Sequence, residues 1–159
     1  QQSNQLRELI AEAHAAGLIV VLWIYPRGKA VTDEKDPDLI AGAAGVALCL
    51  GADFVKVNPP HDVEGQTSAE SLKIASMAAG RTGLVCAGGS KADANVFLTQ
   101  LHDQIHIGGA CGNATGRNIH MRSDDEAIRL CNAISAITLG DWSVEDAEAV
   151  FRGEKEFSL

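Results

Sequence analysis

Two residues that could carry chemistry, a lysine and a tyrosine, stand in separate apolar runs of the chain. Lys56 lies in GADFVKVNPP (51–60) and Tyr25 lies in LIVVLWIYP (18–26). Burial disfavours the charged form of a lysine and lowers its pKa, and a neutral amine can attack a carbonyl carbon to form a Schiff base. A tyrosine hydroxyl nearby can move protons during such a reaction. This pair of residue types is therefore typical of amine-based carbonyl chemistry.

The alternation of side chains along each strand decides whether these groups can meet. Phe54, Lys56 and Asn58 share one face of their run, and Trp23 and Tyr25 share one face of theirs. In an antiparallel sheet Lys56 would point into solvent, which is the commoner place for a lysine between two valines. The runs here alternate with helical segments, which predicts a parallel sheet, and parallel strands are usually covered on both faces. We therefore expect the lysine, the tyrosine and the tryptophan to converge.

Two glycine-rich turns follow the next two expected strands, in AGGSK (87–91) and GACGNATGRN (109–118). Free backbone N–H groups in such turns can bind an anion, and an arginine can hold a phosphate through two parallel hydrogen bonds. Each turn alone is more often only a tight connection. Consecutive glycine-rich strand ends nevertheless match the phosphate site after the last two strands of many (β/α)8 barrels. The candidate phosphate-binding residues are Gly88, Gly89, Ser90, Gly116 and Arg117.

The elements that would position these residues alternate between helix and strand. Periodicity and capping residues predict helices at 3–16, 36–52, from 67 or 68, 91–106 and 123–140, with a short helix after the turn at 115–117, and strands at 18–26, 53–58, 82–90 and 105–112. This order implies an α/β fold with a parallel sheet. An open doubly wound sheet and a (β/α)8 barrel of which four units are present both fit. In either case the site lies at the carboxyl ends of the strands.

Composition narrows the classes of partner. The 159 residues suffice for one domain, the formal net charge is −8, and aromatic residues make up only 4% of the chain. An acidic surface repels nucleic acid and anionic membranes, so neither is an expected partner. The four cysteines form no C-x-x-C pair and no signal peptide opens the chain, which predicts free, buried thiols and a cytoplasmic location. His102 and His106 lack a third ligand, which favours a pair on a helix surface over a metal site.

Four motifs in this order, LWIYPRG, GADFVKVNPP, AGGSK and TGRNIHMRS, resemble the archaeal-type (DhnA/FbaB-like) class I fructose-bisphosphate aldolases of the DeoC-like Schiff-base superfamily. Relatives of that family include the aminodideoxyheptulosonate (ADH) synthases and the LsrF-type thiolases. The resemblance implies a (β/α)8 TIM barrel, of which residues 1–159 would be the C-terminal half with about strands five to eight. It also implies a cytoplasmic enzyme of glycolysis and gluconeogenesis that cleaves or forms fructose 1,6-bisphosphate.

The resemblance also implies roles for single residues. Lys56 would be the Schiff-base lysine and Tyr25 the proton-transferring residue, with Trp23 and Arg27 beside the substrate. The two glycine turns would hold a substrate phosphate. The loop after the lysine would supply an acidic residue, for which Asp62 and Glu64 are the candidates. No cofactor or metal is expected, because the iminium of the Schiff base itself accepts the electrons.

Other hypotheses remain open at the level of sequence. Within Schiff-base chemistry the chain could serve an ADH-synthase-like transaldolase or an LsrF-like thiolase. In a different class, it could be a non-catalytic phosphate-binding half-barrel or a fragment. The first residue is not methionine, and we expect the natural chain to extend upstream. A half-barrel has unpaired sheet edges and an open inner face, so we expect it to form a homo-oligomer or to bind a complementing barrel half.

Overall fold

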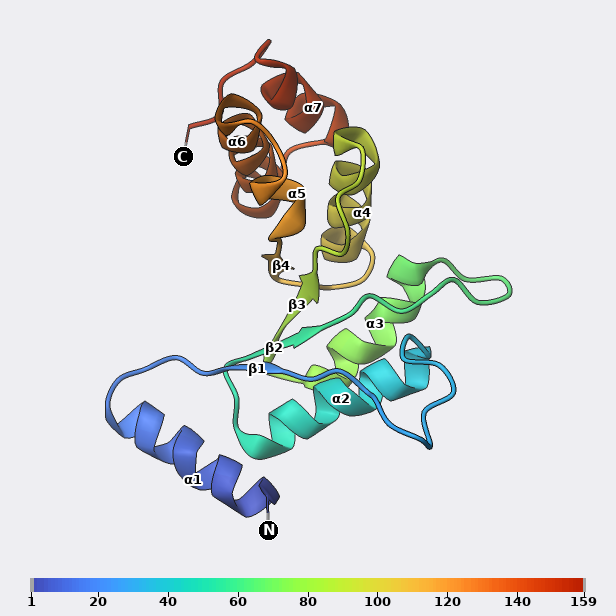
Figure 1. Ribbon diagram of the computed structural model, residues 1–159, viewed down its shortest axis with the longest axis vertical. Helices are drawn as coiled ribbons and strands as arrows, with labels where there is room; N and C mark the ends of the chain where they lie inside the picture. The colour runs from blue at the N-terminus through green and yellow to red at the C-terminus, as the bar shows by residue number, and fades with distance from the viewer. Residues whose placement is uncertain (1, 159) are drawn as a thin grey trace.

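The computed structural model describes residues 2–158 and contains four parallel strands that alternate with helices (Figure 1). The elements in chain order are α1 (Gln2–Ala15), β1 (Val21–Trp23), α2 (Pro37–Leu50), β2 (Phe54–Val57), α3 (Ser68–Ala79), β3 (Gly83–Ala87), α4 (Ala94–His106), β4 (Gly112–Ala114), α5 (Arg117–His120), α6 (Asp124–Gly140) and α7 (Val144–Arg152). The predicted alternation of helix and strand is confirmed.

The strands are shorter than predicted, with β1 limited to Val21–Trp23 of the predicted 18–26, and two further predictions were wrong. A strand was predicted at 105–112, but α4 continues to His106 and β4 begins only at Gly112. Ile105 packs into the cluster formed by α4, α6 and α7, which keeps this segment helical. In addition α7 follows α6 as a separate helix beyond the predicted one at 123–140. Its start is marked by Ser143, whose hydroxyl accepts the backbone N–H of Asp146.

The strand order resolves the choice between the two architectures. The sheet runs β1-β2-β3-β4 in sequence order, and each neighbouring pair is parallel. A doubly wound sheet reverses its order at a switch point, whereas consecutive βα units without a reversal form an arc of a barrel. The structure therefore has the topology of part of a (β/α)8 barrel.

The helices cover one face of the sheet and leave the other face open. Val55 and Val57 on β2 are fully buried and pack with residues of α2 and α3. Phe54 and Lys56, which alternate with them, are only partly buried. Figure 1 shows α2 and α3 side by side along β1 and β2, while α4, α6 and α7 gather near β3 and β4. A one-residue slip would bring the lysine into the apolar core, so this burial fixes the register of β2.

Side-chain caps start three helices where the sequence predicted them. The Asp36 carboxylate accepts the N–H groups of Asp38 and Leu39 at the start of α2. Thr67 before α3 and Ser123 before α6 each form a capping box with the glutamate three residues later. These caps determine where each loop from a strand end joins its helix.

The expectations drawn from composition have mixed outcomes. Only Cys86 is buried, and burial raises the pKa of its thiol to about 12. Cys49, Cys111 and Cys131 are exposed, so the expectation of buried thiols was wrong for three of the four. Cys49 lies on α2 and Cys131 on α6, and Cys111 lies just before β4. Among residues 2–158, no helix combines the length and apolar character needed to cross a bilayer.

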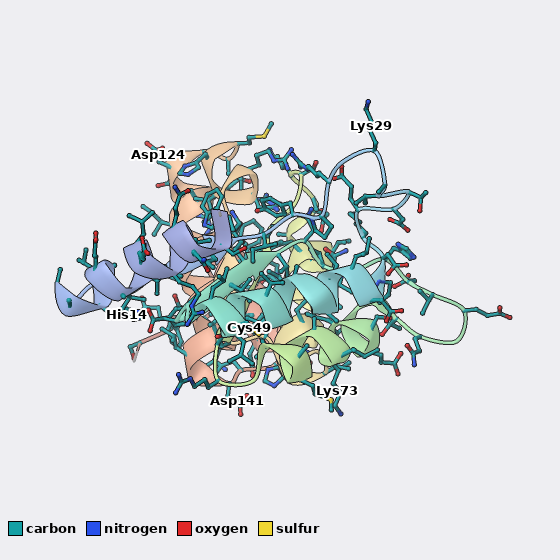
Figure 2. The ribbon with its side chains drawn as sticks, turned by 90° about the horizontal axis from the view of Figure 1, so that it is seen from below. His14, Lys29, Cys49, Lys73, Asp124 and Asp141 are labelled. Atoms are coloured by element: carbon teal, nitrogen blue, oxygen red, sulfur yellow. The ribbon has the colours of Figure 1, made fainter. Side chains whose placement is uncertain are left out.

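Asp53 joins α1 to the sheet at the amino-terminal ends of the strands. Its Oδ2 accepts the Val20 N–H at 2.8 Å and lies 2.9 Å from Nε2 of His14. His14 lies in the last turn of α1, and Figure 2 shows it beside that helix. These bonds stabilise the carboxylate, and the Val20 N–H above all holds the pKa of Asp53 below its ordinary value of 3.8.

Replacing Asp53 with asparagine is expected to lower the midpoint of thermal unfolding at neutral pH by a few degrees and to weaken its dependence on acid. Because the folded-state pKa is lowered, the contribution of this carboxylate is present above the ordinary value and is lost as the pH falls through the folded value. Unfolding curves from about pH 2 to about pH 7 measure this difference. Glu12→Gln, on the exposed side of α1, is the control and should change neither quantity. An unchanged midpoint for Asp53→Asn at neutral pH would show that the bonds of the Asp53 carboxylate to Val20 and His14 do not stabilise the fold.

Candidate active site

Lys56 and Trp23 lie side by side on the open face of the sheet. They are register partners on β2 and β1, and the Lys56 Nζ lies 3.7 Å from the centroid of the Trp23 ring. The predicted convergence of these two side chains is therefore confirmed. Trp23 is 66% exposed, and Lys56 is only partly buried. The full burial expected for the lysine is absent, because no element of residues 2–158 covers this face.

Tyr25 and Arg27 follow β1 at its carboxyl end. The Ile24 N–H donates to the Lys56 carbonyl at 3.0 Å, and the Ile24 side chain packs towards the outer core. Alternation then returns Tyr25 to the face of Trp23 and Lys56. The Arg27 guanidinium lies 5.6 Å from the centroid of the Tyr25 ring, and its Nε is 3.3 Å from a carboxylate oxygen of Glu34. Arg27 thus borders the tyrosine and pairs with Glu34.

The loop that carries Arg27 extends outward beyond β1. Figure 2 shows Lys29 at its tip, pointing away from the body of the molecule. Gly28 has a φ of +131°, a conformation that residues with a side chain rarely adopt. Near the end of this loop, the Asp33 carboxylate lies 3.0 Å from Nδ1 of His61, which follows β2. The loops after β1 and β2 are therefore tied to each other.

The two glycine turns lie against each other at the ends of β3 and β4. The Gly88 N–H donates to the Ala114 carbonyl at 3.2 Å. A Cβ added at Gly88 would stand 2.7 Å from the Thr115 hydroxyl oxygen, so only glycine allows this approach. Gly89 has a φ of +64°, which glycine adopts without strain. Gly116 immediately precedes α5, whose first residue is Arg117. The structure therefore brings both predicted phosphate turns together.

Sequence reasoning missed one residue of this region, Asn118. Its side chain is fully buried, and it hydrogen-bonds to the turn that begins at Gly88. The signal available in the sequence was an asparagine directly after the glycine and arginine of TGRN, where amide side chains often bond to the backbone. Nothing local in the sequence indicates that its partners stand about thirty residues earlier.

A cavity separate from the lysine site borders the glycine turn after β3. It has a volume of about 520 Å³ and is formed by the loop after β2, the turn after β3 and the facing sides of α3 and α4. Gly88, Gly89 and Ser90 line it, whereas Lys56 and Tyr25 do not. At its rim the Asp62 carboxylate accepts the N–H of Ser68 at the start of α3. The lysine site is accordingly an open surface and is distinct from this cavity.

The histidine pair on α4 lies at a partly exposed surface. The rings of His102 and His106 are 4.2 Å apart, and each lies near a carboxylate, of Asp103 and Asp141 respectively. Across residues 2–158, histidine, cysteine, aspartate and glutamate side chains nowhere gather in groups of three or more that could hold a metal ion. The described residues therefore offer no candidate metal centre.

Comparison with known proteins identifies the family. The profile of the DeoC/LacD family aldolases matches residues 1–122. The chain belongs to the DeoC/LacD family of aldolases. The match includes both strands of the lysine site and both glycine turns, which are therefore parts of an aldolase domain.

Individual relatives are also aldolases. The chain is 57% identical over 153 residues to the fructose-bisphosphate aldolase/6-deoxy-5-ketofructose 1-phosphate synthase of Methanocaldococcus jannaschii, covering 96% of this chain and 48% of the relative. The solved fructose-bisphosphate aldolase of Slackia heliotrinireducens superposes with a TM-score of 0.95 at 71% identity, over 99% of this chain and 50% of that one.

A second, more distant solved structure bears on the chemistry of the family. It is an archaeal fructose-1,6-bisphosphate aldolase whose catalytic lysine is covalently bound to the carbinolamine intermediate of the substrate. It matches with a TM-score of 0.72 at 29% identity, over 86% of this chain and 51% of that one. The chain thus spans about half the length of the curated and solved relatives it matches. Together with the strand order, this makes the DeoC/LacD domain seen here a partial (β/α)8 barrel.

Proposed function

We propose that this chain supplies the Schiff-base part of the active site of a class I aldolase that acts on a phosphorylated ketose, with fructose 1,6-bisphosphate as the favoured substrate. The observation that carries the proposal is the position of Lys56, on the inner face of a DeoC/LacD aldolase sheet with its Nζ against the Trp23 ring. Residues 1–159 would form the C-terminal half of a single barrel. The enzyme would act in the cytoplasm, in glycolysis and gluconeogenesis.

The lysine would act as the nucleophile. Its neutral amine attacks the ketone carbon to give a carbinolamine, which loses water to form an iminium. A base then removes the proton from the C4 hydroxyl, the C3–C4 bond breaks, and its electron pair flows into the iminium to give an enamine. The aldehyde half leaves, C3 of the enamine takes up a proton, and water hydrolyses the resulting iminium to free the amine of Lys56.

Tyr25 would handle protons in these steps, since it stands two residues after Trp23, where alternation would place its phenol on the face of Lys56 and Trp23. The site supports this role because the strand pairing continues to Ile24, which keeps Tyr25 one step beyond the lysine along the barrel axis. Arg27 beside the Tyr25 ring would border the same substrate pocket. Trp23 would pack against the carbon chain of the substrate while it contacts the amine.

The phosphate would sit at the paired glycine turns, with Gly89, Ser90 and Gly116 offering backbone N–H groups and Arg117 its guanidinium, while Gly88 allows the close approach of the two turns. Their adjacency in the fold supports one shared anion site. Anchoring the phosphate fixes the ketone relative to the amine. Such fixed orientation replaces an encounter between two freely moving groups and supplies a large part of the rate enhancement.

Reductive trapping of the intact natural polypeptide tests the proposed function. With fructose 1,6-bisphosphate and cyanoborohydride, which reduces the iminium, we expect a covalent adduct on the peptide that contains Lys56. A chelator should leave turnover unchanged, because the iminium is the electron sink. Failure to trap any adduct on that peptide, or loss of activity in the chelator that added metal restores, would overturn the proposal.

The same protein preparation can distinguish the other candidate functions from aldol cleavage. The Methanocaldococcus relative carries a second synthase activity in its name, which supports testing transaldolase-type and thiolase reactions of the ADH-synthase and LsrF kinds. A panel of ketose phosphates and acyl acceptors distinguishes these from simple cleavage. A non-catalytic phosphate-binding half-barrel would bind phosphate without any adduct. Exposed apolar side chains at β1, with Val21 45% exposed, support association with further copies or with a complementing half.

A further inference from the structure

Asn118 is the most completely buried amide side chain at the carboxyl end of the sheet, with an exposed fraction of 0%. Its Nδ2 donates to the carbonyl of Gly88 at 2.7 Å and to that of Ser90 at 3.1 Å, and its Oδ1 accepts the Ala92 N–H at 2.8 Å. Both amide protons and the carbonyl oxygen are therefore bonded. A reversed amide would set oxygen against two carbonyls, so this orientation follows from the partners.

These bonds connect the two glycine turns beyond the point where the strands end. The last register pair of β3 and β4 is Ala87 with Ala114, and Asn118 continues the connection from α5. Arg122 adds to it, because its Nε donates to the Asn118 carbonyl and its Nη2 to the Ala92 carbonyl. The turn after β3 is thus attached along its length to the segment after β4.

The pattern of these bonds bears on anion binding. Carbonyl oxygens repel a phosphate, and two of those in the turn, on Gly88 and Ser90, are bound by the Asn118 amide. Within residues 2–158, neither the Gly89 nor the Ser90 N–H donates to a protein acceptor. The turn therefore has its carbonyls occupied and two of its N–H groups free. This is the state that a phosphate requires of a backbone turn.

We propose that Asn118 is a positioning residue for phosphate binding: it holds the carbonyls of Gly88 and Ser90 so that the two glycine turns act as one anion site. The inference rests on the proposed function, since it concerns the substrate phosphate. Asn118 acts through the turns and does not itself touch the substrate.

The test compares two ketones that differ only in the phosphate. Dihydroxyacetone phosphate and dihydroxyacetone are each trapped on the intact natural polypeptide with cyanoborohydride, and the half-saturating concentration is measured by mass spectrometry. In Asn118→Ala, and in Asn118→Asp, which preserves volume but loses both donors, we expect the value for the phosphorylated ketone to rise about ten- to thirtyfold, as for one to two net hydrogen bonds. The value for dihydroxyacetone should stay within about twofold.

Thr82 provides a matched control at the opposite end of the sheet. It is also buried, and its hydroxyl donates to the Ala52 carbonyl at 2.9 Å. Thr82→Val therefore removes a comparable buried hydrogen bond far from the turns. It should lower the thermal midpoint as the Asn118 variants do, while the ratio of the two half-saturating concentrations stays at the wild-type value.

Several outcomes would overturn the inference. Equal losses for both ketones in the Asn118 variants, or loss of all trapping, would make this residue a contributor to folding alone. An unchanged ratio would show that the turns bind phosphate without it. If the wild-type protein traps neither ketone, the proposed function fails, and the inference fails with it. A wild-type protein that traps both ketones, with variants that lose selectivity, supports both proposals.

Discussion

Replacing Lys56 with methionine is expected to abolish both turnover and adduct formation. Methionine has a similar length but no amine, so neither carbinolamine nor iminium can form. Removal of a covalent nucleophile costs on the order of 10⁴-fold or more in kcat. Steady-state cleavage of fructose 1,6-bisphosphate and the intact mass after cyanoborohydride treatment measure the two effects on the same preparation.

Two companion variants separate nucleophilic attack from charge. Lys56→Arg keeps a cation that can lie over the Trp23 ring, which in the parent is 3.7 Å from Nζ, yet a guanidinium does not form a Schiff base. It should be as inactive as the methionine variant. Lys73→Met, on the exposed side of α3 in Figure 2, should retain full activity and trapping. An adduct that still forms at the parent rate in Lys56→Met would remove this lysine from the mechanism.

At the lysine site, the alternation of side chains along each strand could predict which residues share a face of the sheet. Alternation along FVKV and LWIY was enough to place Lys56 opposite Val55 and Val57 and beside Trp23, because the buried valines allow only one register. The degree of burial of Lys56 could not be predicted in the same way. It depends on what faces the lysine across the barrel, and residues 2–158 place nothing there.

The order of helices and strands alone could not decide between an open sheet and a barrel. A series of βα units fits an open sheet and a barrel equally well, and the observed β1-β2-β3-β4 order confirms the barrel that the family resemblance implied. The strand predicted at 105–112 failed for a related reason. Its alternating isoleucines suit a strand, but Ile105 packs against a cluster that includes residues of α6 and α7, which are distant in sequence. Long-range packing here overrides the local period.

The glycine turns were predictable as separate motifs, but the connection between them was not. Gly88 and Gly116 could be recognised from turn chemistry alone. The contact between the turns is made by Asn118 across about thirty residues, and no spacing rule marks an asparagine as buried. The same limit applies to Cys111, predicted to be buried and found exposed just before β4.

Replacing Tyr25 with phenylalanine is expected to slow cleavage of fructose 1,6-bisphosphate by about 10²- to 10⁴-fold, the range for removal of a general acid or base. The ring that lies 5.6 Å from the Arg27 guanidinium is retained, so the end of β1 keeps its packing. The amine of Lys56 is untouched, and dihydroxyacetone phosphate should still be trapped by cyanoborohydride. The variant therefore separates proton transfer from Schiff-base formation, which Lys56→Met cannot do.

Hydrogen exchange distinguishes which proton Tyr25 moves. In deuterated water, the parent enzyme should exchange a C3 hydrogen of dihydroxyacetone phosphate through the enamine, and nuclear magnetic resonance follows this exchange without any aldehyde present. If Tyr25 protonates the enamine, Tyr25→Phe loses exchange and cleavage together while the iminium still forms. If exchange persists while cleavage is lost, the hydroxyl acts instead at the C4 oxygen. A variant with parent-like cleavage would exclude Tyr25 from proton transfer altogether, and the acid and base would then have to come from residues that face β1 across the barrel.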